Sequence, residues 1–433
     1  MSGMFHSLRS YNYRLWAGGA LVSNLGTWMQ RIGQDWLVLT VLTRHSATAV
    51  GMVMALQFGP SLLLLPLSGH AADHMDRRKL LLFTQAAAGL LALGLGIVTL
   101  AGVVQLWQVY GFALLLGCVT AFDAPARQAF VSDLVRDDSL ANAVALNSAS
   151  FNAARMVGPA IAGLLIAAVG EAWLFLINAG SYGAVLVSLW WLRVHELHPH
   201  PPPERARGGL LAGLHYVRQR PDLVAVLAML ALIGTFGFNF AIFISTMSVT
   251  VFHGDASQYG LLTSAMAVGT MSGALLSARR PFPGMLLMGG AAAVFGIAMA
   301  LAAVMPTTWS FAAVLFVVGV SSLTFMTASN SMMQLTTERG MRGRVLALRI
   351  AVVMGGTPIG APLVGWVVDR FGARWALGVG ALSGVAAAGV ALAYLVRHRD
   401  LRVRIQGGRL RLALHPAPAY TTETTVSAGE RVT

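Results

Sequence analysis

A stripe of polar and charged residues follows one face of an apolar segment near the N-terminus. At positions i, i+4, i+7 and i+11 stand Asn24, Trp28, Arg31 and Asp35, and this spacing places side chains on one side of a helix. If Trp28 lies near the middle of a hydrocarbon core about 30 Å thick, Asp35 lies about 11 Å farther out. This face could bind a ligand or carry a proton, although Asp35 could also snorkel into the outer interface beside Trp36.

A second stripe with the same spacing occurs in the fifth apolar segment, where Ser148, Asn152, Arg155 and Pro159 recur. An arginine near the middle of a membrane helix costs about 2.5–3.5 kcal/mol or more. Arg155 is therefore expected to face a wet cavity, or alternatively to form a structural ion pair.

Carboxylates in the second half of the chain all lie in or beside predicted loops, at Asp222, Asp255, Glu338, Asp369 and Asp400. If a carboxylate within the membrane carries a proton, the first half must supply it, and Asp35 is the leading candidate. Burial disfavours a charged carboxylate and a nearby cation favours it. We therefore expect Asp35 to be coupled to Arg31, one turn away.

Composition excludes several classes of protein. The chain has 433 residues, of which 56% are hydrophobic and 11% charged, against about 25% charged in soluble domains. The net charge of +13 comes without a basic groove or stacking aromatics, so nucleic acid is not an expected partner. Lys79 is the only lysine and follows Arg78, so no phosphate-binding G-x-x-x-x-G-K-[ST] loop exists. We expect no cofactor, no metal and no enzymatic activity.

Twelve apolar segments predict an all-α membrane protein with both termini in the cytoplasm. Under this topology 25 of the 30 Arg and Lys residues fall on the inside and three on the outside, as the positive-inside rule requires. The two others, Arg31 and Arg155, lie within the membrane. The predicted segments are 15–41, 47–71, 80–102, 106–126, 143–168, 171–192, 223–251, 257–277, 284–304, 309–333, 345–368 and 373–396.

The chain divides into two six-helix bundles, 1–192 and 223–396, joined by a linker over 193–222. The linker contains His195, His198 and His200 before three prolines, which favours an extended spacer over a metal site. Leu210, Leu214 and Val217 then predict a short amphipathic helix on the membrane surface. Residues 397–433 are expected to form a basic stretch and then a disordered cytoplasmic tail.

The halves repeat each other at an offset of 202 residues, which pairs Gly158 with Gly360 and Gly163 with Gly365. At an offset of 208, the triplet Gly26-Thr27-Trp28 corresponds to residues 234–236. Duplicated halves around a site at the midplane are typical of alternating-access transporters. We expect a cavity lined by Asn24, Trp28, Arg31, Asn152, Arg155, Phe236 and Asn239, with Gly158, Pro159, Gly163, Gly360 and Gly365 packing the helices around it.

The loop after the second segment resembles the signature of the major facilitator superfamily, G-x-x-x-D-R-x-G-R-[RK]. Gly69, Asp73, Arg77 and Arg78 match this pattern, whereas His74 and Asp76 replace the usual Arg and Gly. The resemblance implies two pseudo-symmetric bundles. It also implies a cytoplasmic latch formed by Asp73, Arg77 and either Asp123 or Arg127.

Further motifs resemble the drug-efflux branch that includes the enterobactin exporter. They comprise Asp123-Ala-Pro125, Arg127-Gln128, Asn147, Asn152, Arg155 and Gly158-Pro159-x-x-Ala162-Gly163. The last also resembles the antiporter motif of the fifth helix, without its upstream glycines. The resemblance implies a monomeric, proton-coupled exporter of small amphipathic or lipophilic molecules, drug-like or siderophore-like, in a bacterial-type inner membrane. A symporter or facilitator that imports a solute remains the alternative, and a sensor that does not transport is harder to exclude than a membrane enzyme.

Overall fold

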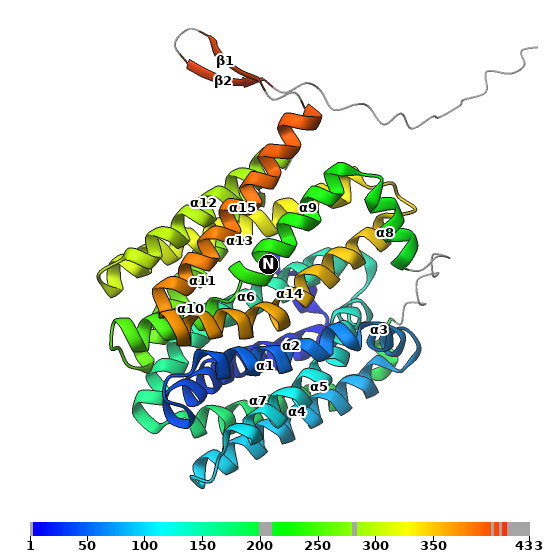
Figure 1. Cartoon of the computed structure of the whole chain (residues 1–433). Helices are drawn as coiled ribbons and strands as arrows, with labels where there is room; N and C mark the ends of the chain where they lie inside the picture. The colour runs from blue at the N-terminus through cyan, green and yellow to red at the C-terminus, as the bar shows by residue number, and fades with distance from the viewer. Residues whose placement is uncertain (1–2, 199–209, 279–283, 400–401, 407–408, 414–433) are drawn as a thin grey trace, which may run out of the picture.

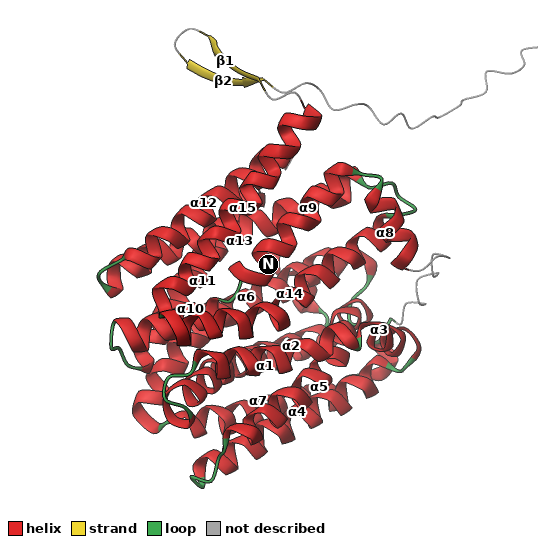
Figure 2. Cartoon of the chain, in the orientation of Figure 1, coloured by secondary structure: helices red, strands yellow, loops and turns green. Residues whose placement is uncertain are grey.

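The computed structural model describes the chain except for residues 1–2, 199–209, 279–283, 400–401, 407–408 and 414–433 (Figure 1). The described part is helical apart from one small hairpin (Figure 2). Its α-helices are α1 (Tyr11–Trp36), α2 (Ala47–Leu63), α3 (Leu65–His74), α4 (Arg77–Leu100), α5 (Leu106–Asp133), α6 (Asp137–Val169), α7 (Glu171–Trp190), α8 (Leu210–Arg218), α9 (Pro221–Leu232), α10 (Phe240–Thr246), α11 (Ala256–Ala278), α12 (Met285–Val304), α13 (Thr308–Thr336), α14 (Arg342–Phe371) and α15 (Ala373–Arg399).

Membrane spans account for nearly all of these helices. Within the described residues, ten spans are long and apolar enough to cross a bilayer, and α2 with α3, bent by 57°, adds an eleventh. The remaining predicted span is α1, which continues through a π-helical turn at Leu37–Leu42. It is the most polar of the long helices because it carries the stripe that ends at Asp35. The fold is therefore the all-α, two-bundle architecture that the sequence predicts.

Local sequence explains where several helices begin and end. Asp76 caps α4 by accepting a hydrogen bond from the Lys79 amide at 3.1 Å, which satisfies one free N–H of the first turn. Gly170 separates α6 from α7 with φ +85°, and Gly372 separates α14 from α15 with φ +97°. These two glycines are partners in the 202-residue repeat, and both turns need a conformation that side chains disfavour.

Among the described residues, two helix crossings form most of the contact between the bundles. In the first bundle α1 packs on α6 and α7, and α4 packs on α5 and α7; in the second, α12 packs on α13 and α15, and α11 packs on α13. Between the bundles, α2 packs against α14 and α6 against α11 (Figure 1).

Both crossings become very close at one end of the molecule. A Cβ atom on Gly365 would lie 2.5 Å from the carbonyl oxygen of Ala47, and one on Gly163 would lie 2.5 Å from that of Ala256. Beside the first crossing, the Asp369 carboxylate accepts hydrogen bonds from the amides of residues 47 and 48, at 2.6 and 3.0 Å, and from the Ser46 hydroxyl at 2.9 Å. A residue of α14 thus caps α2 and holds this end closed.

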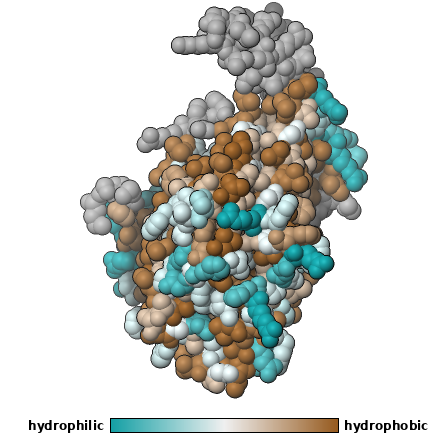
Figure 3. All heavy atoms as spheres, turned by 60° about the vertical axis from the view of Figure 1, so that its left-hand side comes forward, coloured by the Kyte–Doolittle hydropathy of each residue, from teal (hydrophilic) through white to brown (hydrophobic). Residues whose placement is uncertain are grey.

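On the face that Figure 3 shows, apolar side chains are spread over the surface among hydrophilic ones. Large side chains such as Leu63, Phe83, Trp190 and Trp309 are at least 73% exposed. In water such a surface would drive association, whereas acyl chains solvate it without cost. This agrees with a multi-pass membrane protein.

The linker and tail contain further structure. The amphipathic helix corresponds to α8, in which Val217 is buried and Gly213 faces Arg344 and Leu348 of α14. The basic stretch after α15 forms an antiparallel hairpin of β1 (Arg402–Gln406) and β2 (Arg409–Ala413), which the sequence analysis did not assign although alternating Arg and apolar residues favour a strand. His200 and the expected disordered end after residue 413 lie outside the described residues.

The close approach at Gly365 generates a prediction about the closed end. Gly365→Val should push α14 away from α2, because overpacking a tight contact costs about 1–3 kcal/mol. We expect a disulfide between Ser46→Cys and Asp369→Cys, introduced in a Cys118→Ser background, to form several-fold more slowly in this variant. Gly378→Val is the matched control, since nothing lies within 4 Å of that glycine's Cβ position. Equal cross-linking in the two variants would contradict the role of this contact.

Candidate functional site

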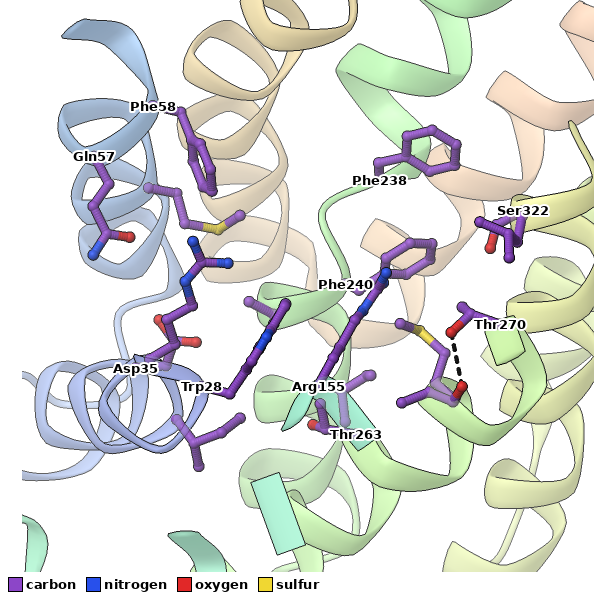
Figure 4. A pocket seen from close by; sticks show the side chains of 18 of the residues that line it. Trp28, Asp35, Gln57, Phe58, Arg155, Phe238, Phe240, Thr263, Thr270 and Ser322 are labelled. Atoms are coloured by element: carbon purple, nitrogen blue, oxygen red, sulfur yellow. Dashed lines mark hydrogen bonds between the residues drawn. The ribbon is translucent and has the colours of Figure 1, made fainter. Parts of the chain in front are cut away.

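A cavity of about 450 Å³ lies between the two bundles (Figure 4). The first bundle contributes Trp28, Arg31 and Asp35 from α1, Gln57 and Phe58 from α2, and Arg155 from α6, while the second contributes residues of α10, α11, α13 and α14. Four residues that the sequence analysis selected are therefore brought together in one wall: Trp28, Arg31, Asp35 and Arg155.

Trp28 is contacted by two guanidinium groups. The Cζ atom of Arg31 lies 4.8 Å from the centre of its ring, and that of Arg155 lies 5.5 Å from it. Phe151 meets the same indole edge to face at 5.8 Å. Each cation over the aromatic face gains roughly 0.5–2 kcal/mol, so the ring holds two like charges near each other. In Figure 4 the side chains of Trp28 and Arg155 lie beside one another in the cavity.

Gly158 makes this arrangement sterically possible. A Cβ atom at this position would lie 2.8 Å from the Cβ atom of Trp28, so only glycine lets α6 approach α1 so closely. Arg155 stands one turn before Gly158 on α6, and the close approach brings its side chain to the indole. The position of Arg155 at Trp28 therefore depends on the close helix packing that Gly158 permits.

Neither guanidinium group is in contact with a carboxylate of a described residue. Among the described residues, neither Arg31 nor Arg155 forms an ion pair or donates a hydrogen bond to another protein group. The structural ion pair considered for Arg155 is therefore not formed in this conformation. Two positive charges remain available in a wall in which half of the other residues are aromatic or methionine. Such surroundings suit an anionic, partly apolar ligand.

Asp35 is bonded across the bundle interface rather than to Arg31. Its Oδ2 atom accepts a hydrogen bond of 3.0 Å from the hydroxyl of Tyr259, a residue of α11. Asp35 is 9% exposed and Tyr259 1%, and no ion pair joins Asp35 to Arg31 in the part of the chain that the structure describes. The carboxyl group thus connects the first bundle to the second.

Tyr259 was not identified from the sequence, although a signal for it existed. The residues of α11 that line the cavity are Tyr259, Thr263, Met266 and Thr270, together with Ala267. The first four recur at i, i+4, i+7 and i+11, which is the spacing of the polar stripe on α1. A search of the sequence for residues at i, i+4, i+7 and i+11 that did not require a charged residue in the set would have found them.

Four residues expected in the cavity do not line it: Asn24, Asn152, Phe236 and Asn239. The amide of Asn152 donates to the carbonyl of Ser148 on its own helix, and that of Asn239 donates to Thr235. A π-helical turn over Ile233–Gly237 changes the angular position of the residues that follow it. Phe238 and Phe240 therefore face the cavity in place of Phe236.

Arg349 was counted with the inside loops but lies within α14. One of its terminal nitrogens donates to the carbonyl of Met326 at 3.1 Å and to the hydroxyl of Ser329 at 3.3 Å. It therefore ties α14 to α13, and its charge has partners that those of Arg31 and Arg155 lack.

The signature loop and the end of α5 form a polar cluster in the first bundle. Arg77 pairs with Asp133 at 2.7 Å, and Arg78 donates to the carbonyl of Leu189 at 2.8 Å. The sequence analysis missed Asp133 because α5 runs seven residues beyond its predicted end at 126.

The other expected members of the latch are arranged separately. Asp123 pairs with Arg127 at 3.1 Å and accepts hydrogen bonds from Thr84 and Gln85. Asp73 has no hydrogen bond or ion pair to another described residue, and Gly69 faces open space. The interaction of Asp73 with Asp123 or Arg127 is therefore not assembled in this conformation.

Curated relatives with similar sequences are siderophore transporters. The staphyloferrin A transporter of Staphylococcus aureus is 28% identical over 352 residues, covering 80% of this chain and 87% of that protein. The enterobactin exporter EntS of Shigella flexneri is 29% identical over 334 residues, covering 74% and 77%.

Solved structures support the same architecture. A bacterial homologue of the human lysosomal transporter Spinster, in an inward-facing and unoccupied conformation, superposes with a TM-score of 0.68 at 14% identity, covering 91% of this chain and 96% of that one. Residues 2–408 match the family described as transmembrane secretion effector. The chain therefore belongs to the transmembrane secretion effector family of the major facilitator superfamily.

Proposed function

We propose that this protein is a secondary active exporter of small amphipathic anions of the siderophore type, working by alternating access in exchange for protons. The observation that carries the proposal is the pair of guanidinium groups that both lie over Trp28 and form no ion pair among the described residues. Such a pair in an aromatic cavity attracts a negatively charged, partly apolar solute. The names of the relatives, a staphyloferrin A transporter and an enterobactin exporter, point to the same class of substrate.

The shape of the cavity supports loading from the cytoplasm. The end that carries Asp369 is closed by backbone contacts, whereas Phe151 and Met354, both in the cavity wall, keep 45% and 40% of their surface exposed. In the topology favoured by the positive charges, the closed end faces outward and the signature loop lies in the cytoplasm. The conformation is then inward-facing, which suits an exporter waiting for substrate.

The proton would be carried by Asp35. Because this carboxyl group is bonded to Tyr259 of the opposite bundle, separation of the bundles at the outer end must break the bond. Asp35 would then meet water from outside, where it could accept a proton, and release it toward the cavity after closure. Arg31, one turn away, and Arg155, across Trp28, are the charged groups that face the same cavity, and an anion bound to them would alter the field at Asp35.

The direction of transport has a direct test. Everted membrane vesicles energised by respiration should accumulate an anionic siderophore such as enterobactin, and a protonophore should abolish the accumulation. Uptake by right-side-out cells, driven by the same gradient, would instead favour the importing alternative. Accumulation that survives collapse of both the proton and the sodium gradient would contradict secondary active transport.

Removal of a cavity charge should weaken anion binding. Arg155→Gln should raise the Kd of the transported anion about 10- to 100-fold, since a hydrogen bond to a charged group contributes about 1.5–3 kcal/mol. Binding to purified protein in nanodiscs measures this change. Arg374→Gln is the control, because Arg374 bonds only to carbonyl groups at the outer end. Equal Kd values in the two variants would contradict the proposed charge recognition.

The hydrogen bond between Tyr259 and Asp35 predicts a non-additive pair of mutations. Asp35→Asn should retain downhill flux and lose uphill export. Tyr259→Phe, which removes only the hydroxyl group, should impair uphill export in the wild type and have no further effect in the Asp35→Asn background. Tyr394→Phe on α15 serves as the control for loss of a hydroxyl group. If Asp35→Asn retains uphill export, the proton is carried elsewhere.

Asp73, which has no partner in this conformation, should act in the opposite one. Asp73→Asn is expected to slow turnover severalfold while leaving the Kd of the substrate nearly unchanged, because the residue lies in the signature loop and not in the cavity. Glu171→Gln, at the outer end of α7, is the matched control. A large loss of affinity at unchanged turnover would refute a latch.

A further inference from the structure

A second cavity, of about 480 Å³, lies inside the first bundle and adjoins the central one. Its walls come from α1, α2, α3, α5 and α7, with Ile350 and Met354 of α14 at its edge. The two cavities share Arg31, Gln57, Phe58 and Met354. We refer to this second space as the side chamber.

The side chamber differs in chemistry from the central cavity. Among the described residues that line it, Arg31, at the junction, is the only charged one. Nine further members are uncharged hydrogen-bonding side chains: Thr27, Gln30, Gln57, Ser61, Ser68, Thr120, Gln128, Asn178 and Tyr182. So many polar groups within a membrane bundle are costly unless they bond to one another, to water or to a ligand.

Part of this polar wall is satisfied within the protein. The amide of Asn178 donates to Gln30 at 2.6 Å, and the hydroxyl groups of Thr27 and Tyr182 lie 3.5 Å apart. These contacts join α1 to α7 and account for one side of the chamber. They explain those residues without a ligand.

The opposite side is not satisfied in this way. Gln57, Ser61, Thr120 and Gln128 form no hydrogen bond to another described residue. Thr120 and Gln128 are exposed, and Gln57 and Ser61 are half-buried. On α5, Thr120 and Gln128 are two turns apart with the small Ala124 between them, so one face of this helix offers hydrogen bonds and space.

The backbone of α5 adds another acceptor to the same wall. Pro125 has no N–H group, so the carbonyl of Ala121, four residues earlier, lacks its usual helical donor. Both Ala121 and Pro125 line the side chamber. A proline inside a membrane helix is tolerated where other groups can bond to the released carbonyl.

We infer that the side chamber is a second binding compartment, which takes the uncharged, hydrogen-bonding part of an amphipathic anion, such as hydroxyl or amide groups. The inference rests on the proposed function, because the anionic and aromatic part of the same molecule lies in the central cavity. Arg31 stands at the junction and contacts both parts. Discrimination among anions by their polar groups then depends on α2 and α5, not on the cation pair.

Two fluorescent probes test this inference: 1-naphthoate, and a 1-naphthoate that carries a neutral glucosyl ether. The measurement is the ratio of their Kd values on the full-length protein in nanodiscs. Wild-type protein should bind the glucosyl probe about tenfold more tightly, and Thr120→Val and Gln128→Leu should each reduce this preference several-fold. Thr120→Val is nearly isosteric, so it should fold normally.

Two controls separate the compartment from the proposed function. Thr324→Val on α13, whose hydroxyl bonds to its own helix, should leave the ratio unchanged, and Arg31→Gln should weaken both probes. No preference for the glucosyl probe in wild-type protein, or a preference that survives in both α5 variants, overturns the inference. Binding of 1-naphthoate that does not depend on Arg31 or Arg155 contradicts the anionic substrate instead.

Discussion

The cost of charge in a hydrocarbon environment is the constraint on which the rest of this structure depends. Arg31, Asp35 and Arg155 lie in helices that cross the bilayer, and no lipid can solvate them. They are accommodated because the two bundles leave a cavity between them, where an indole ring lies against both guanidinium groups and a tyrosine hydroxyl bonds to the carboxyl group. The interface between the bundles is therefore the place where polar chemistry is concentrated.

The residue types differ between one end of this interface and its middle. At the end that carries Asp369, glycines bring backbones together, as small residues do in membrane proteins generally, and Asp369 places its charge at the positive end of the α2 dipole. In the middle, large aromatic rings and methionines keep the bundles apart. Close contact at one end and a cavity farther along the interface are compatible with the alternating access that we propose.

Much of this could be predicted from the sequence, because the positions of charged residues and the helical spacing of polar residues can be read from the sequence alone. The spans, the repeat and the stripe that contains Trp28, Arg31 and Asp35 all follow from hydropathy and helical spacing. The pairing of Tyr259 with Asp35 could not be predicted, since helical spacing identifies the face on which each residue lies but not which residue, 224 positions away, it meets. Phe236, which the 208-residue repeat pairs with Trp28, does not line the cavity for a local reason: it lies in a π-helical turn, which changes the direction of its side chain relative to a regular α-helix.

The bend between α2 and α3 has a mechanical consequence. Pro66 lacks the amide hydrogen that a continuous helix would use there, and the two helices meet at 57°. Acting as a rigid lever about 15 Å long, α3 would carry its far end through about 14 Å if the bend straightened. Asp73 stands near that far end, so a change of a few backbone angles near Leu64 would move the signature loop by more than the distance of about 8–10 Å between packed helices.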